Sequence, residues 1–174
     1  AEITLTIQPG VTVYGFAGTA TGYGTSSGYY RYSTLHVYGT LVAQGTVDEP
    51  IVFTSANATK AAGNWGYISF QPGSTGVVSH ATVEYGRSSG IYVNDASPSL
   101  NNIIVRDVAG DGIQISGTYS TPITNCQIQN ASGDGIQLVG AASPSISDCQ
   151  IQNVTGWGVN ASTSTGAYNY ELSN

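Results

Sequence analysis

The amino-acid sequence predicts an all-β fold of stacked coils, because one unit of sequence repeats along the middle of the chain. Three copies begin at Gly90, Gly112 and Gly135, and they read GIYVNDASPSLNNIIVRDVAGD, GIQISGTYSTPITNCQIQNASGD and GIQLVGAASPSISDCQIQNVTGW. One copy therefore occupies 22 or 23 residues. A fixed period of this length is typical of solenoids, in which each repeat forms one coil and packs on its neighbours.

Inside each copy apolar residues alternate with polar ones, as Ile113 and Ile115 do on either side of Gln114. A period of two predicts short, half-buried strands. Equivalent apolar residues of successive copies fall into three columns: Leu100, Ile123 and Ile146; Ile103, Cys126 and Cys149; Val105, Ile128 and Ile151. Because one coil cannot bury its own apolar row and a stack of coils can, the pattern predicts a parallel β-helix.

The same register extends beyond the three copies towards both ends of the chain. Val78, Ala81 and Val83 fall in the three columns, and Ile68 and Phe70 match Ile91 and Val93. One coil earlier the fit is less regular, with Leu35, Val37, Ile51 and Phe53. An opening coil is indicated by Leu5, Ile7, Val11 and Val13, and Val159 continues the series at the other end. We expect about six to seven coils in a single domain over residues 1–174. It has excursions at about 15–33 and 55–65 and a non-repeating tail at about 162–174.

At this point the chain resembles a known family. The segments LTIQPGVTVYG, LHVYGTLVAQGTVDEPIVFTS and NWGYISF and the three repeats look like the right-handed parallel β-helix repeats of secreted and cell-surface microbial proteins, a superfamily that includes the pectate lyases. The resemblance covers almost the whole chain and implies a right-handed coil. It implies little about function, because this fold serves adhesins, surface scaffolds and polysaccharide-active enzymes.

The composition excludes several function classes. Charged residues make up 8% of the chain, apolar residues 40%, and the formal net charge is −6. A single lysine, Lys60, and scattered arginines (Arg31, Arg87 and Arg106) do not form the positive cluster that nucleic acid requires. No apolar run reaches the ~20 residues of a membrane-spanning helix. We therefore expect that the protein neither binds nucleic acid nor spans a membrane.

Several features favour an extracellular or cell-surface location. The chain lacks methionine and begins Ala-Glu-Ile, as a mature chain does after a targeting segment is removed, although a chosen boundary would look the same. Four Asn-x-Ser/Thr sequons permit glycosylation, at Asn57, Asn130, Asn153 and Asn160. In a chain this rich in Ser and Thr, some sequons arise by chance.

Tyrosines provide the candidate contacts for a ligand or partner. The excursion at 15–33 is rich in Tyr, Gly and Ser, which is the composition of adaptable binding surfaces. The alternative is a flexible loop without a ligand. The candidate contacts are Tyr23, Tyr29, Tyr30 and Tyr32 in this excursion, and Tyr67 and Tyr92 on outward positions of the coils.

Polar residues at repeated positions have structural interpretations. Asn102, Asn125 and Asp148 share a position with His80 and predict a ladder of turn side chains, with catalysis as the alternative for His80. Glu84 and Arg106 are equivalent outward positions of adjacent coils. They predict an exposed ion pair that contributes ~0–1 kcal/mol.

The two cysteines, Cys126 and Cys149, share an inward column one coil apart. Stacked parallel residues lie ~4.8 Å apart, at the edge of what a disulfide allows. The sequence therefore leaves two possibilities, a buried pair of thiols or a disulfide. Without nearby histidines the pair does not form a metal site.

We expect no catalytic site and no cofactor. The lyases and hydrolases of this superfamily need a close set of carboxylates, and the lyases a basic residue to accept the proton. The carboxylates here are isolated turn residues, and no motif of those enzymes matches residue by residue. The isolated carboxylates are Asp95, Asp107, Asp111 and Asp134.

The two ends of the sequence lack a recognisable cap and predict assembly, because strand-like EITLTI begins at residue 2 and Glu171 is the only charge after Asp148. A β-helix exposes unpaired backbone groups on its end coils, and proteins usually cover such edges with a helix or charged residues. The sequence therefore predicts a structural or adhesive subunit that associates head to tail, or a flanking β-helix segment; a polysaccharide-binding or polysaccharide-degrading module is the alternative. A tail that folds back on its own last coil would instead prevent assembly. The candidate assembly contacts are Ile3, Leu5, Tyr168, Tyr170 and Leu172.

Overall fold

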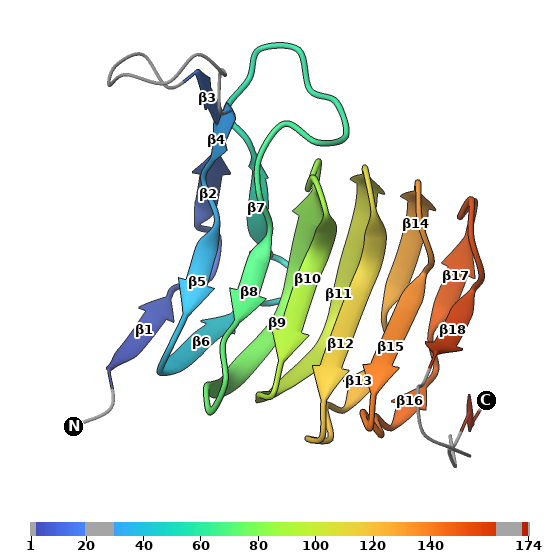
Figure 1. Ribbon diagram of the computed structural model, residues 1–174. Helices are drawn as coiled ribbons and strands as arrows, with labels where there is room; N and C mark the ends of the chain where they lie inside the picture. Colours follow the sequence, from blue (N-terminus) through green and yellow to red (C-terminus); the bar gives the residue numbers. More distant parts are fainter. Residues whose placement is uncertain (1–2, 20–29, 163–171, 174) are drawn as a thin grey trace, which may run out of the picture.

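The structure, a computed structural model, describes residues 3–19, 30–162 and 172–173. These residues form strands and connecting turns that coil along one axis, so that the first and last described coils lie at opposite ends of the stack (Figure 1). All pairs of strands are parallel except one hairpin. The described residues contain no helix that could span a membrane.

Two parallel sheets face each other across the stack. The larger has eleven described strands. Its main path runs through β1 (Thr4–Ile7), β6 (Thr40–Gln44), β9 (Thr75–Glu84), β11 (Ser97–Val108), β13 (Ile123–Thr124), β16 (Ile146–Ser147) and β19 (Leu172–Ser173). Beside this path lie β2 (Thr12–Gly15), β7 (Ile51–Ser55), β14 (Gln127–Ala131) and β17 (Gln150–Gln152).

The second sheet has six strands and runs along the opposite face of the stack. Its order is β5 (Leu35–Val37), β8 (Ile68–Phe70), β10 (Ser89–Asn94), β12 (Asp111–Gly117), β15 (Ile136–Gly140) and β18 (Val159–Ser162). The antiparallel hairpin of β3 (Ala17–Thr19) and β4 (Tyr30–Tyr32) projects from the first coil.

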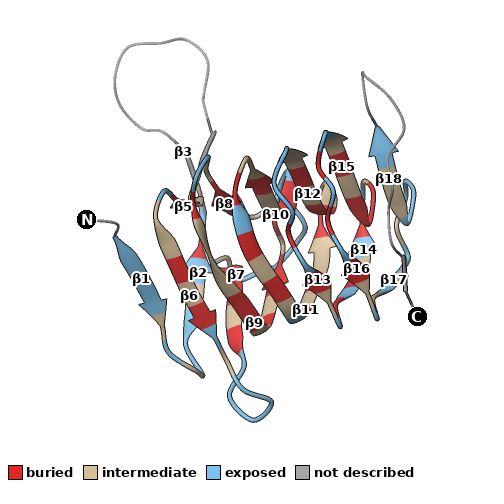
Figure 2. Ribbon diagram, turned by 90° about the horizontal axis from the view of Figure 1, so that it is seen from below, coloured by how far each residue is buried: buried red, intermediate tan, exposed pale blue. Residues whose placement is uncertain are grey.

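The columns predicted from the sequence are confirmed and extend further than the repeats. Strand pairing aligns two columns through six coils: Ile7, Ala43, Val78, Leu100, Ile123 and Ile146; Val13, Phe53, Val83, Val105, Ile128 and Ile151. Another column follows the second sheet: Leu35, Ile68, Ile91, Ile113, Ile136 and Val159. The inward side chains of the middle coils are buried and form one core (Figure 2).

The glycine that opens each repeat is required by this packing. A Cβ atom on Gly112 would lie 2.4 Å from Cγ2 of Ile128, and one on Gly135 would lie 2.4 Å from Cγ2 of Ile151. Such distances are far inside van der Waals contact. Glycine at this position therefore lets the second sheet approach the inward column of the first.

The polar ladder predicted at His80, Asn102, Asn125 and Asp148 has a backbone cause. These residues adopt positive φ angles of 46°, 51°, 54° and 53°. Asn and Asp tolerate this left-handed conformation better than most residues. The bend that they make turns the chain between two strand segments of each coil.

A second ladder of the same kind was not predicted from the sequence. Tyr85, Asp107, Asn130 and Asn153 have φ angles of 65°, 54°, 55° and 53°. Asn130 donates from Nδ2 to Asp107 Oδ1 at 2.8 Å, so this ladder also links successive coils. It turns the chain at the end of β14 and its equivalents.

We expect Ile128→Asp to abolish folding, because Ile128 is fully buried between Val105 and Ile151. An unpaired buried charge costs several kcal/mol, comparable to a total stability of about 5–15 kcal/mol. Gln127→Asp is the matched control, because Gln127 is an exposed neighbour on the same strand. Thermal unfolding followed by circular dichroism distinguishes the two variants, and cooperative native-like melting of Ile128→Asp would contradict the register.

Candidate functional site

The first coil of the stack has free strand edges. β1 pairs with β6, β2 with β7 and β5 with β8, and each occupies the end of its ladder. In the described residues these strands have no neighbour on their outer side. Their outward backbone N–H and C=O groups are therefore available to a further strand.

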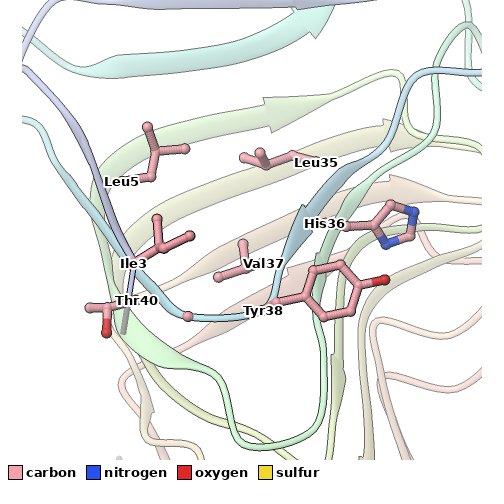
Figure 3. A pocket seen from close by; sticks show the side chains of 8 residues that line it. Ile3, Leu5, Leu35, His36, Val37, Tyr38 and Thr40 are labelled. Atoms are coloured by element: carbon pink, nitrogen blue, oxygen red, sulfur yellow. The ribbon is translucent and has the colours of Figure 1, made fainter. Parts of the chain in front are cut away.

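Apolar side chains are exposed at the same end, which we call the open end. Ile3 is 82% exposed, Tyr38 76% and Leu5 45%, although Ile3 and Leu5 lie at the start of a β-helix core. Between them is a recess of about 210 Å³. In Figure 3 the side chains of Ile3, Leu5, Leu35 and Val37 face this recess, with His36 and Tyr38 beside it.

A second recess of about 200 Å³ shares Leu35 with the first. It is lined by Val13, Tyr14, Gly15, Ser33, Thr34, Leu35 and Trp65. No charged residue occurs in the sequence from residue 3 to residue 30. The residues that line the two recesses include no Asp, Glu, Lys or Arg. The open end therefore has apolar recesses and free strand edges, and a further coil stacked on it would bury more apolar area.

The opposite end continues the same columns. Ile151 and Val159 are half-buried there, and among the described strands β17 and β18 each pair on one side only. The sequence from residue 149 to residue 170 carries no charge. Both ends thus share the coil shape and lack the charges that usually protect strand edges.

The predicted assembly residues divide between the two ends. Ile3 and Leu5 lie at the open end, as described above. Leu172 belongs to β19 and pairs with Ile146 of its own chain, so this strand extends its own sheet and not that of a neighbour. Tyr168 and Tyr170 lie outside the described residues.

The predicted tyrosine contacts are only partly brought together. The rings of Tyr67 and Tyr92 are 6.3 Å apart and nearly perpendicular. The Arg87 guanidinium lies 4.2 Å from the centre of the Tyr32 ring. Tyr30 belongs to β4, and Tyr23 and Tyr29 lie outside the described residues.

The ion pair of Glu84 and Arg106 is present, but the prediction that it is exposed is wrong. Glu84 is only 5% exposed. Arg106 Nη2 lies 2.7 Å from Glu84 Oε2, and Thr54 Oγ1 donates to Glu84 Oε1 at 2.7 Å. Lys60 Nζ is 3.9 Å from Glu84 Oε1. Lys60 comes from the excursion at 55–65, whose contact with β9 buries the carboxylate.

Trp65 closes this excursion against the coil. Its side chain is buried, and its Nε1 donates to the backbone oxygen of Glu84 at 2.7 Å.

The hydrogen bond that Arg106 donates to the Glu84 carboxylate is the main cause of the raised pKa of Arg106. Burial, and then the negative charge of Glu84, raise the pKa of Tyr85. These contacts stabilise the charged pair and attach the excursion to the stack.

The other acidic side chains bond to turns. Thr118 N–H donates to Asp95 Oδ1 at 3.1 Å, and Asp134 N–H donates to Asp111 Oδ1 at 2.7 Å. Burial raises the pKa of Asp111, partly offset by that hydrogen bond. Within the described ranges, no three His, Cys, Asp or Glu side chains come together as a metal site. The carboxylates thus have structural roles in successive turns.

Three of the four sequon asparagines use Nδ2 in hydrogen bonds. Asn130 donates to Asp107, Asn153 to Asn130 Oδ1 at 3.4 Å, and Asn160 to Asp134 Oδ2 at 2.7 Å. Attachment of a glycan to Nδ2 would disturb these bonds. Asn57 lies in the excursion, where its backbone N–H donates to Ser55 Oγ.

Comparison with known proteins gives one match. A family model described as a right handed beta helix region matches residues 25–174. No curated protein and no solved structure matches the chain.

We expect Arg106→Ala to lower the free energy of unfolding by about 2 kcal/mol, because it leaves the Glu84 carboxylate buried without its closest cation. Lys60→Ala is the matched control. Its amino group is 3.9 Å from the same carboxylate, so its loss should cost less than about 1 kcal/mol. Denaturant unfolding measures both, and equal effects of the two variants would contradict this account of the site.

Proposed function

We propose that this chain, which belongs to the right-handed β-helix family, is a non-catalytic structural or adhesive protein of the cell surface that assembles end to end. The observation that carries the proposal is the open end. There Ile3 and Leu5 are exposed beside an apolar recess, and the strand edges are free. The occupant that fits this end is the last coil of a second copy.

The repeating register supports a second copy as the occupant. Val13 and Ile151 belong to one column, and Leu35 and Val159 to another, so β17 and β18 present edges equivalent to those of β2 and β5. The edge of β16 is instead paired with β19 of the same chain, so the contact would be made through β17 and β18. A coil that stacks on its neighbour within the chain has the right spacing to stack on the first coil of another chain. Such a contact is heterologous and produces an open filament unless the rotation closes a ring.

The surface supports an extracellular, non-catalytic role. Charged residues are 8% of the chain, so the contact with water is made mainly by polar, uncharged side chains. A surface of this kind responds little to salt or pH. The carboxylates Asp95, Asp111 and Asp134 bond to backbone N–H groups of turns, which is a structural role.

A second function, polysaccharide binding, is favoured by the Tyr67 and Tyr92 rings on outward positions of adjacent coils. Beside them the amides of Gln114 and Gln137 form a hydrogen bond of 2.6 Å, and tyrosine and amide side chains are suited to sugars. This function is compatible with the first.

We expect the chain to associate in a concentration-dependent way, with masses that are multiples of the single chain. Ile3→Lys should keep it monomeric, because the lysine places charge on the open end. Val47→Lys is the matched control, because Val47 has the same exposed fraction of 82% but lies in the turn after β6. Light scattering over a wide concentration range measures the mass. A monomer at all concentrations, or equal behaviour of the two variants, would refute the assembly.

A further inference from the structure

The two cysteines lie opposite each other in consecutive coils. Thr124 pairs with Ser147 on one side of them, and Gln127 pairs with Gln150 on the other. Between these pairs the N–H of Gln150 donates to the backbone oxygen of Cys126 at 2.8 Å. Adjacent strands are ~4.8 Å apart, within the Cα separation of about 4.4–6.8 Å that a disulfide spans.

The two side chains are oriented in the same way. Each Sγ lies 3.2 Å from a carbonyl oxygen two residues earlier, that of Thr124 for Cys126 and that of Ser147 for Cys149. Each also approaches a carbonyl oxygen of the preceding coil, Leu100 O at 3.8 Å and Ile123 O at 3.6 Å. Equivalent contacts in consecutive coils place one sulfur above the other. Both thiols are free.

The environments of the two sulfurs differ. Cys126 is buried, whereas Cys149 is partly exposed. A hydrogen bond from the Cys126 thiol lowers the pKa of Cys149 to about 7, and the same hydrogen bond, together with burial, raises the pKa of Cys126. Near neutral pH Cys149 is therefore the nucleophile of the pair, because the thiolate is the reactive form.

We propose that Cys126 and Cys149 are a redox-active pair that forms a reversible disulfide between two coils by exchange with a small-molecule disulfide. The Cys149 thiolate attacks one sulfur of that disulfide, forms a mixed disulfide and releases one thiolate. The Cys126 thiol then loses its proton and attacks Cys149 Sγ, which releases the second thiolate. The two cysteines are oxidised and the small disulfide is reduced to two thiols.

The geometry makes this bond reversible. A disulfide requires Cβ atoms about 3.5–4.5 Å apart, less than the ~4.8 Å between strands, so the coils must move together. Strained disulfides are more easily reduced. The bond closes a loop of one coil. It stabilises the folded stack mainly because the crosslink lowers the conformational entropy of the unfolded chain. The inference does not depend on the proposed function, because it concerns the pair within one chain.

The test is to incubate the folded chain with excess oxidised glutathione and to count thiols that iodoacetamide alkylates after unfolding. We expect the count to fall from two to none in the monomer, with an intact mass lower by two hydrogens and no glutathione attached. The Tm should rise by about 5 °C, and dithiothreitol should reverse it. Two retained thiols, a stable glutathione adduct on the unmodified sequence, or disulfide-linked dimers would each overturn the proposal.

Two variants test the separate roles of the sulfurs. Cys126→Ser should accumulate a glutathione adduct at Cys149, because the resolving thiol is missing. Cys149→Ser should acquire much less adduct, because Cys126 is buried. Oxidation should not raise the Tm of either variant above the Tm of the same variant in its reduced form. Equal labelling of the two variants would contradict the assigned nucleophile.

Discussion

Apolar side chains that point into the stack find too few partners within their own coil, and they are buried only against the equivalent side chains of the coils on either side. Val105, for example, lies in register with Val83 and Ile128. This contact fixes the other features of the repeat. It requires the register to be kept from coil to coil, glycine where the sheets approach, as at Gly112, and left-handed turns at residues such as Asn125.

The same interaction explains why apolar side chains remain uncovered at the first coil. In the middle coils the inward side chains have neighbours in the coils on both sides, as Val105 does. At the first coil the series stops, and Figure 2 shows β1 exposed where the equivalent parts of β6 and β9 are largely buried or half-buried. An end with free edges and uncovered apolar residues is complementary to another coil of the same shape.

The repeating part of the fold could be predicted from the sequence because a period shows itself in every copy. The three columns, the chain of coils and the ladder at Asn102 all follow from it. The burial of Glu84 could not be predicted, because it depends on Lys60 and Trp65 of a segment that does not repeat. The second ladder could not be predicted because its first member, Tyr85, is not a typical turn residue. The other members, Asp107, Asn130 and Asn153, are polar and favour turns.

Electron microscopy of the purified chain at increasing concentration tests the central claim most directly. Stacking of equivalent end coils predicts rods of constant width, equal to that of a single β-helix, whose length increases with concentration along the coil axis. Single particles of one fixed length at every concentration, or particles that widen by side-by-side association, would contradict the claim that the open end is completed by a second copy.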